Sequence, residues 1–190
     1  MRSALETGFE LDRLWHRLRG EMEATKKPAL LAVARILDEA GVAYALIGGL
    51  ALQIHQREPR TTLDIDLAVV DRAAVPRPAL EAGGFRHTGR FPHSDNWLAP
   101  DGTPLQITDD AALAGAIARA GVVDLDGQRL RVIGVADLIH EKLRAGTDPA
   151  RRRSKRIQDL ADVAGLLEQD PALAVELSAA ERAILETLPR

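Results

Sequence analysis

Apolar residues recur at helical spacing near both ends of the chain. The first stripe has the spacing i, i+3, i+4, i+7 and i+11 and consists of Leu11, Leu14, Trp15, Leu18 and Met22. Such a stripe predicts an amphipathic helix with one apolar side. A second helix is predicted between Pro28, a favourable first helical residue, and Gly41, a favourable stop. At the other end, helices are predicted over residues 135–145 and 151–168, and a last one after Ser178.

The middle of the chain contains short apolar runs separated by turn residues. These runs predict strands over residues 42–47, 64–70, 85–90, 96–99, 103–108, 122–125 and 129–133. Further helices are predicted over residues 50–55, 75–82 and 111–120. This order predicts an α+β fold with a mixed β-sheet flanked by helices and with helical N- and C-terminal segments. We divide the chain into an N-terminal helix, an α/β core and a C-terminal helical segment, at residues 1–27, 28–134 and 135–190.

The composition excludes several classes of protein. With 190 residues, 46% of them hydrophobic, the chain can bury a core, which excludes a disordered chain. Lys and Arg number 25 and Asp and Glu 28, which gives a net charge of −3. The molecule as a whole therefore lacks the basic surface that is typical of nucleic-acid-binding proteins. Cysteine is absent, which excludes disulfides and thiolate chemistry. No apolar stretch reaches the roughly 20 residues of a membrane span, so we expect a cytoplasmic protein with no membrane partner.

Two acidic residues interrupt one of the predicted strands. Asp64 and Asp66 are two residues apart, so in a strand both carboxylates point to the same face, with Cα atoms about 6.6 Å apart. Two ionised carboxylates at this distance repel each other, and a divalent cation between them removes the repulsion. Hard oxygen ligands of this kind suit Mg²⁺. The alternative is a pair of solvated residues at the edge of a sheet.

A glycine pair ends the preceding strand and begins a helix. Gly48 and Gly49 carry no Cβ, so a phosphate could approach the backbone there, and the amide groups up to Leu50 would favour a negative charge. The alternative is an ordinary turn. Backbone amides that can bind phosphates and a pair of carboxylates that can bind a cation lie close together in the sequence. Together they predict a site for a nucleoside triphosphate with Mg²⁺.

The segment around these residues resembles the signature of the DNA polymerase β-like nucleotidyltransferase superfamily, a hydrophobic strand, Gly-Gly and then Asp-x-Asp. More narrowly, Gly48-Gly49-Leu50-Ala51 followed by Arg60-x-Thr62-x-Asp64-Ile65-Asp66 resembles the bacterial branch of AbiEii-type toxins and related nucleotidyltransferase-like proteins. That branch also carries a lysine on a later helix and then a basic stretch leading into an Asp-rich helix, as at residues 137–143 and 153–162 here. The resemblance covers about residues 30–168.

The resemblance implies transfer of a nucleotide from an NTP such as ATP to an acceptor. Asp64 and Asp66 would hold Mg²⁺, and the amides around Gly48, Gly49 and Leu50 would hold the phosphates. An acceptor hydroxyl would attack the α-phosphorus and pyrophosphate would leave, so that catalysis consists of positioning and charge neutralisation.

One position departs from the pattern of the superfamily. A third carboxylate is expected on a later strand, and the matching strand carries Gln106 instead, which cannot accept a proton and is a poor ligand for Mg²⁺. Asp109 lies an odd number of residues further on, so it faces the other side if the strand continues, and it could reach the site only if the strand ends at Thr108. Gln106 therefore favours an alternative in which the fold is kept and turnover is lost.

Several basic residues are candidates for contacts with phosphates. Lys142 occupies the i+7 position of an apolar stripe, so its ammonium either points into a cleft or snorkels out to solvent. Arg153 and Lys155 belong to a basic segment that could hold a triphosphate or an RNA end, the alternative being a solvated helix start. Arg60 and Thr62 flank the aspartates, and Arg60 either neutralises Asp64, touches a phosphate or forms a plain salt bridge. Asp159 and Asp162 are expected to pair with Lys155 and Arg156 on the same helix.

Three functions follow from these features. The first is an Mg²⁺-dependent nucleotidyltransferase, as a toxin with a DNA-binding antitoxin partner, acting on tRNA, a protein side chain or a small molecule. The second is a nucleotide-binding or regulatory protein without turnover. The third is a protein-interaction module that takes no ligand.

Overall fold

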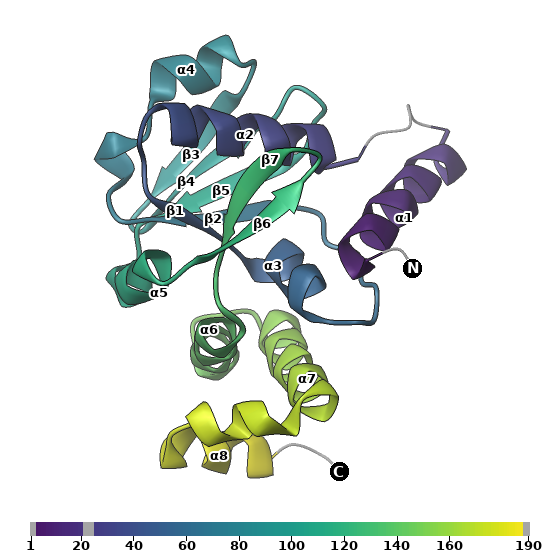
Figure 1. Ribbon diagram of the computed structural model, residues 1–190, viewed down its shortest axis with the longest axis vertical. Coiled ribbons are helices and arrows are strands. Elements are labelled where there is room, and N and C mark those ends of the chain that lie inside the picture. The colour runs from purple at the N-terminus through teal and green to yellow at the C-terminus, as the bar shows by residue number, and fades with distance from the viewer. Residues whose placement is uncertain (1–2, 21–24, 188–190) are drawn as a thin grey trace.

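The computed structural model describes residues 3–20 and 25–187 of the chain. Within these residues a seven-stranded mixed sheet has the strand order β3-β4-β5-β2-β1-β7-β6 (Figure 1). The strands are β1 (Tyr44–Ile47), β2 (Ile65–Val69), β3 (Arg86–Phe91), β4 (Ser94–Leu98), β5 (Pro104–Thr108), β6 (Gly121–Leu125) and β7 (Gln128–Val132). Two pairs are parallel, β2 with β5 and β1 with β7, and the other neighbours are antiparallel. The predicted mixed sheet is therefore confirmed.

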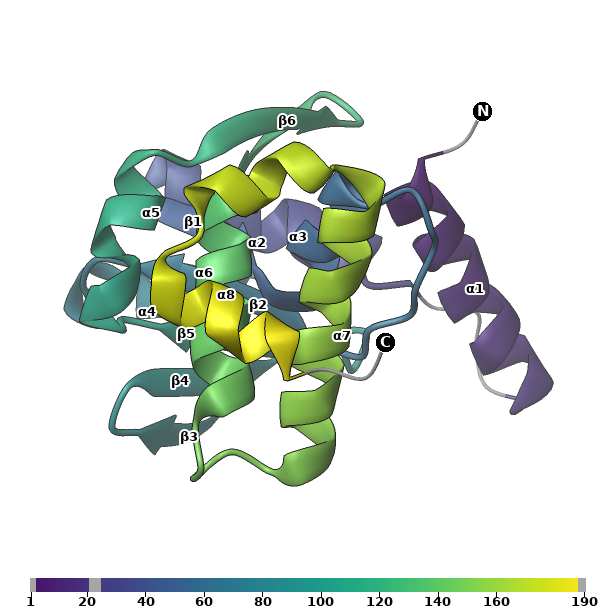
Figure 2. The same ribbon diagram turned by 90° about the horizontal axis from the view of Figure 1, so that it is seen from below.

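Helices cover both faces of this sheet. The helices are α1 (Ala4–Leu18), α2 (Lys27–Glu39), α3 (Gly48–His55), α4 (Arg77–Ala82), α5 (Ala114–Ala118), α6 (Val135–Thr147), α7 (Arg153–Gln169) and α8 (Ala179–Glu186). In the same described residues, three short 3-10 helices accompany them, η1 (Arg72–Ala74), η2 (Ala111–Leu113) and η3 (Pro171–Glu176). In Figure 1, α2 and α4 lie on one side of the sheet and α6, α7 and α8 on the other. The view from below in Figure 2 shows α6, α7 and α8 in front of the sheet.

The element boundaries differ from the prediction where backbone chemistry intervenes. The helix predicted over residues 75–82 begins only at Arg77, because a proline disfavours helical backbone in the residue before it and Pro76 follows Val75. The helix predicted over residues 111–120 is shorter and starts with a 3-10 turn. The side chain of Asp110 accepts the amide hydrogen of Ala112 there. The strand predicted from Asp64 starts one residue later.

The hydrophobic core lies between the sheet and its helices. Side chains alternate as expected for strands with one buried face: in β5, Leu105 and Ile107 are buried while Gln106 is exposed. The apolar side of α2 is buried at the predicted positions, Leu30, Val33, Ala34 and Leu37. Of the helices in the described residues, not one is both long and apolar enough to cross a membrane.

The apolar stripe of α1 lies outside this core. Its described members are between about a third and three-quarters exposed: Leu11 36%, Leu14 47%, Trp15 57% and Leu18 75%. The helix is attached instead through the neighbouring side, where Leu5 and Phe9 are buried. Met22, the last member of the predicted stripe, lies outside the described residues. Periodicity identified the helix, but it did not identify the side that packs against the rest of the protein.

Candidate functional site

A row of polar side chains crosses the sheet between β2 and β4. Asp66 of β2 is paired with Ile47 of β1 and with Gln106 of β5, and Gln106 is paired with Asn96 of β4. Because directly paired residues present their side chains on the same face, Gln106 lies beside Asp66. The register therefore places an amide where a third carboxylate was expected.

The glycine pair packs against Asp66 and against Thr62, the residue that is bonded to Asp64. Gly48 follows Ile47 and has a φ of +63°, which favours glycine. A Cβ at Gly48 would collide with Oδ2 of Asp66. A Cβ at Gly49 would lie 2.6 Å from Oγ1 of Thr62, whose hydroxyl donates a 2.9 Å hydrogen bond to Oδ1 of Asp64. The two predicted segments thus form one compact unit, and α3 begins at Gly48 rather than at the predicted Leu50.

The carboxyl group of Asp66 is in an unfavourable environment for a negative charge. Its pKa is raised from 3.8 to about 7, first by burial, then by the charges of Asp64 and Glu141. The charges of Lys142 and Lys155 lower the pKa of Asp66 by less. A cation bound at Asp66 would remove this penalty.

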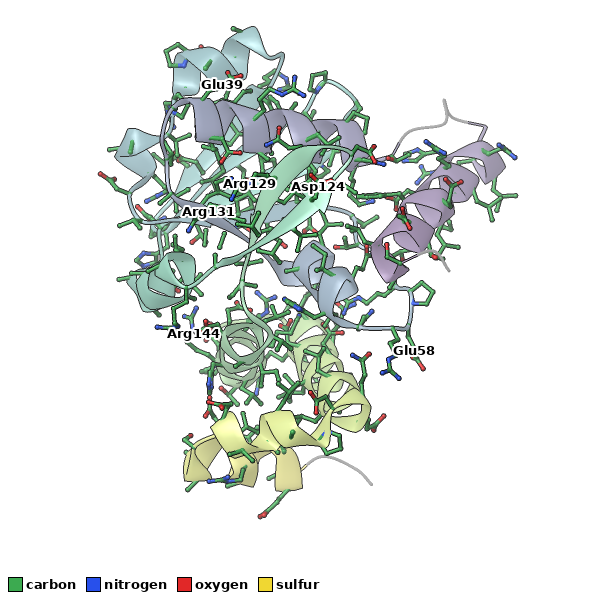
Figure 3. All side chains as sticks on the ribbon, in the orientation of Figure 1. Glu39, Glu58, Asp124, Arg129, Arg131 and Arg144 are labelled. Carbon is green, nitrogen blue, oxygen red and sulfur yellow. The ribbon has the colours of Figure 1, made fainter. Side chains whose placement is uncertain are left out.

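A cavity of about 350 Å³ opens beside Asp66. Asp66 of β2, Gln106 of β5 and Gly48 at the start of α3 lie on its wall, and the opposite wall comes from α6, the segment that joins α6 to α7, and α7. Besides Asp66, the charged residues that line the cavity are Asp110, which precedes η2, and Glu141, Lys142, Arg144, Asp148, Arg151 and Asp159 from α6, α7 and the segment between them. Figure 3 labels Arg144 beside α6, on the side of the sheet where the cavity lies. Several predicted site residues lie outside its lining, namely Gly49, Leu50, Arg60, Thr62, Asp64, Arg153 and Lys155.

Lys142 is buried and bound to carboxylates of α7. Its ammonium donates hydrogen bonds of 3.2 Å to Oδ1 of Asp159 and 2.7 Å to Oδ2 of Asp162. The side chain is 4% exposed, so it does not snorkel. It reaches the cavity wall, but its charge is already compensated by two carboxylates. Lys142 therefore holds α6 and α7 together.

The same aspartates bind two arginines. Arg60 forms an ion pair with Asp162, and Arg151 donates a 2.9 Å hydrogen bond to Asp159. Of the alternatives for Arg60, the plain salt bridge is the one observed. The predicted pairing of the aspartates with Lys155 and Arg156 is wrong, because both carboxylates point toward α6 and Lys155 is exposed.

The other basic candidates lie at the start of α7. Arg153 and Lys155 are exposed in its first turn, outside the cavity lining. Lys155 is still near enough to lower the pKa of Asp66. Arg151, which precedes the helix, is the basic residue of this segment that lines the cavity beside α7. The sequence located the basic segment but not the residue in it that faces the cavity.

Glu141 is a site residue that the sequence analysis missed. It lines the cavity, it is partly buried, and burial raises its pKa. Asp110 and Asp159, which also line the cavity, form ion pairs with Arg144 and Lys142 respectively. Within residues 3–20 and 25–187, by contrast, no donor or cation bonds to the carboxyl groups of Glu141 and Asp66. A signal was available, because Glu141 adjoins the buried position of Lys142 on α6.

Asp109 does not complete the acidic group. β5 ends at Thr108, and the carboxylate of Asp109 lies 2.8 Å from Nε of Arg72, away from the cavity lining. The part of the chain that the structure describes contains no group of three His, Cys, Asp or Glu side chains that could enclose a metal ion. Asp64 and Asp66 remain as a pair of carboxylates. Such a pair fits Mg²⁺, which takes one or two carboxylates and completes its shell with water and substrate phosphates.

Comparison of the sequence with family models and with curated proteins finds no match. Comparison with solved structures does find similar folds. An antigenic nucleotidyltransferase-like protein from Paracoccidioides brasiliensis is 21% identical with a TM-score of 0.54, over 85% of this chain and 90% of that one. ANT(2")-Ia, solved with adenylyl-2"-tobramycin, is 18% identical with a TM-score of 0.56, over 84% of this chain and 99% of that one. The Megavirus polyadenylate synthase is 15% identical with a TM-score of 0.53, over 88% of this chain and 36% of the synthase.

At these identities the likeness concerns the fold. It confirms the predicted fold class, a nucleotidyltransferase-like mixed sheet flanked by helices.

Proposed function

We propose that this protein is an Mg²⁺-dependent nucleotidyltransferase that moves an NMP group from an NTP such as ATP to an acceptor. The observation that carries the proposal is the contact between Gly48 and Asp66 at the wall of a cavity large enough for a nucleotide. The glycine at the start of α3 leaves room for a phosphate near the backbone amides, and the unpaired carboxylate of Asp66 beside it can bind the cation of the triphosphate. The solved structures with this fold include an adenylylation product complex and a polyadenylate synthase.

Each residue of the site has a role in this reaction. Asp64 and Asp66 would hold Mg²⁺, which when bound supplies positive charge to the triphosphate. The amides of Gly48, Gly49 and Leu50 would bind phosphate oxygens, and the guanidinium groups of Arg144 and Arg151 lie on the facing wall. Thr62 orients Asp64 through its hydrogen bond.

The bond changes are those of an in-line displacement. The acceptor hydroxyl oxygen forms a bond to the α-phosphorus, and the bond from that phosphorus to the bridging oxygen of pyrophosphate breaks. The proton of the hydroxyl passes to a base. Gln106 cannot accept it, so we assign the proton to Glu141, which faces the same cavity.

Transfer of label from NTPs tests the proposal. We expect label from an α-labelled NTP with Mg²⁺ to appear on a component of an acceptor extract, and Asp66→Ala to reduce the rate by at least about 1000-fold. Glu39→Ala is the matched control, because Glu39 lies at the end of α2 on the other side of the sheet (Figure 3). No transfer with all four NTPs and a broad extract would count against the proposal.

Gln106 favours a second candidate function, a nucleotide-binding or regulatory protein without turnover. In that case Mg·NTP raises the melting temperature, because a ligand that binds the folded state stabilises it, but no label is transferred. A melting temperature unchanged by Mg·NTP would instead favour a protein-interaction module without a ligand.

Variants at Gln106 and Glu141 separate turnover from binding alone. If the wild type transfers nucleotide, Glu141→Gln should slow the transfer by about 100- to 10,000-fold and leave NTP binding unchanged. If the wild type only binds, Gln106→Asp should introduce transfer, because it places a carboxylate beside Asp66. Full transfer by Glu141→Gln would show that another group accepts the proton.

The finer assignment follows the resemblance to AbiEii-type toxins. It extends the proposal to the toxin of a two-component system, whose partner is a DNA-binding antitoxin. A gene for a small DNA-binding protein beside this one would support it. The labelled acceptor decides between tRNA, a protein side chain and a small molecule.

A further inference from the structure

α1 lies at the edge of the molecule and is attached along one side only. Leu5 and Phe9 are buried, Gly8 lies against Gln53 of α3, and the buried Asp12 forms an ion pair with Lys26. Figures 1 and 2 both show α1 at the periphery of the molecule, away from α6, α7 and α8. The helix is therefore fixed in place, and a large part of its surface can be reached.

The reachable side carries the apolar stripe of Leu11, Leu14, Trp15 and Leu18. These residues have the spacing with which helices pack side by side, and none of them is buried. Four large apolar side chains in one stripe are unusual on a monomeric surface, where exposed apolar residues are normally scattered. A partner with a matching apolar stripe would cover them.

The charges of α1 match those of the same helix running in the opposite direction. Glu10 and Arg17 are seven residues apart, so they lie on one side of the helix, close to the two ends of the stripe. Antiparallel pairing of two such helices places Glu10 of one copy opposite Arg17 of the other, twice. Within one copy Glu10 binds Arg13 at 2.8 Å, an exposed pair of small energetic value, and Arg17 also has an interaction within its own chain, so pairing between copies would exchange surface contacts rather than satisfy free charges.

We propose that this stripe joins two copies of the chain through an antiparallel pair of α1 helices related by a two-fold axis. The surface is self-complementary, as a two-fold interface requires. One pair of 15-residue helices gives an interface at the small end of the usual range, so the dimer is in equilibrium with the monomer.

Sedimentation equilibrium of the nucleotide-free wild type, up to about 0.5 mM, tests the proposal. We expect the average mass to rise with concentration from the 20.6 kDa of one chain to about twice that value. Leu14→Glu should weaken the association at least about 10-fold, because it buries a charge in an apolar interface. Leu18→Glu should do the same. Val175→Glu, at a position 78% exposed in η3, is the control and should leave the association unchanged.

A charge exchange distinguishes self-association from a general attraction between apolar surfaces. Glu10→Arg and Arg17→Glu should each weaken the dimer a few-fold, and the double variant should recover the wild-type association. A wild type that keeps the mass of one chain at the highest concentration overturns the proposal. So does a Leu14→Glu variant that associates as well as the wild type while circular dichroism shows it to be folded.

Discussion

Replacing Asp66 by Asn is expected to stabilise the metal-free protein at pH 8 by up to about 4 kcal/mol. The folded protein holds the pKa of Asp66 at about 7, well above the ordinary 3.8, because the carboxyl group is buried near Asp64 and Glu141. The difference between these two pKa values corresponds to at most about 4 kcal/mol. Asn keeps the shape of the side chain and carries no charge.

The sign of the pH dependence follows from the raised pKa. Below about pH 4 the Asp66 carboxyl is protonated in both the folded and the unfolded chain, so its burial adds no charge penalty. As the pH rises toward 7 the unfolded chain loses the proton first, and the folded protein loses stability relative to it. Above about pH 7 the penalty is complete, so the advantage of Asp66→Asn is largest there.

Urea unfolding with EDTA at pH 4, 6 and 8 measures this effect. The difference between the free energies of unfolding of Asp66→Asn and wild type should grow with pH. Asp101→Asn is the control: Asp101 accepts a hydrogen bond from the amide of Thr103, which Asn can also accept. An advantage that is independent of pH, or a variant less stable than wild type at pH 8, would contradict the prediction.

Lys142→Met is expected to lower the free energy of unfolding by about 3–5 kcal/mol. The ammonium of Lys142 compensates Asp159 and Asp162, which are 9% exposed as side chains, and its removal leaves them close together with less positive charge. For a chain of this length the loss corresponds to a fall of roughly 10 °C in melting temperature. Calorimetry at pH 7 gives the value directly.

Arg151→Met is the matched control for this change. Arg151 binds the same Asp159 but its side chain is 42% exposed, so its removal should cost less than about 1 kcal/mol. Equal losses for the two variants, or a loss under about 1 kcal/mol for Lys142→Met, would show that Lys142 does not hold α6 and α7 together.

The sequence predicted the parts of the fold and site that depend on local pattern. Apolar runs located the strands. One of these strands leads into Gly48 and the next one carries Asp66, and the prediction that the two segments form one unit agrees with their contact in the structure. The place of Gln106 followed from the resemblance, which puts the third carboxylate of the superfamily at this position, and the structure pairs Gln106 in register with Asp66.

The features that escaped prediction depend on contacts between distant segments. Asp162 is 102 residues from its partner Arg60 in the sequence. Sequence spacing alone does not show that Asp162 pairs with this distant arginine rather than with a basic residue of its own helix. The covered side of α1 is set by α3, and a helical stripe does not say what it faces. Glu141 faces Asp66 because α6 lies across the cavity, and its neighbour Lys142 was the local signal for it that the sequence analysis did not use.

The ion pairs of α7 tie the end of the chain to the loop that carries Asp64. Asp162 binds Arg60, four residues before Asp64, and Gln169 accepts the amide hydrogen of Arg57 and donates to the carbonyl of His55. A shortened chain ending after α6 would keep all seven strands of the described residues but lose these contacts, so the loop between α3 and β2 is expected to be held less firmly. If the protein has the proposed function, α7 supports the loop that carries Asp64, and an exchange of this helix between related proteins is expected to change activity as well as shape.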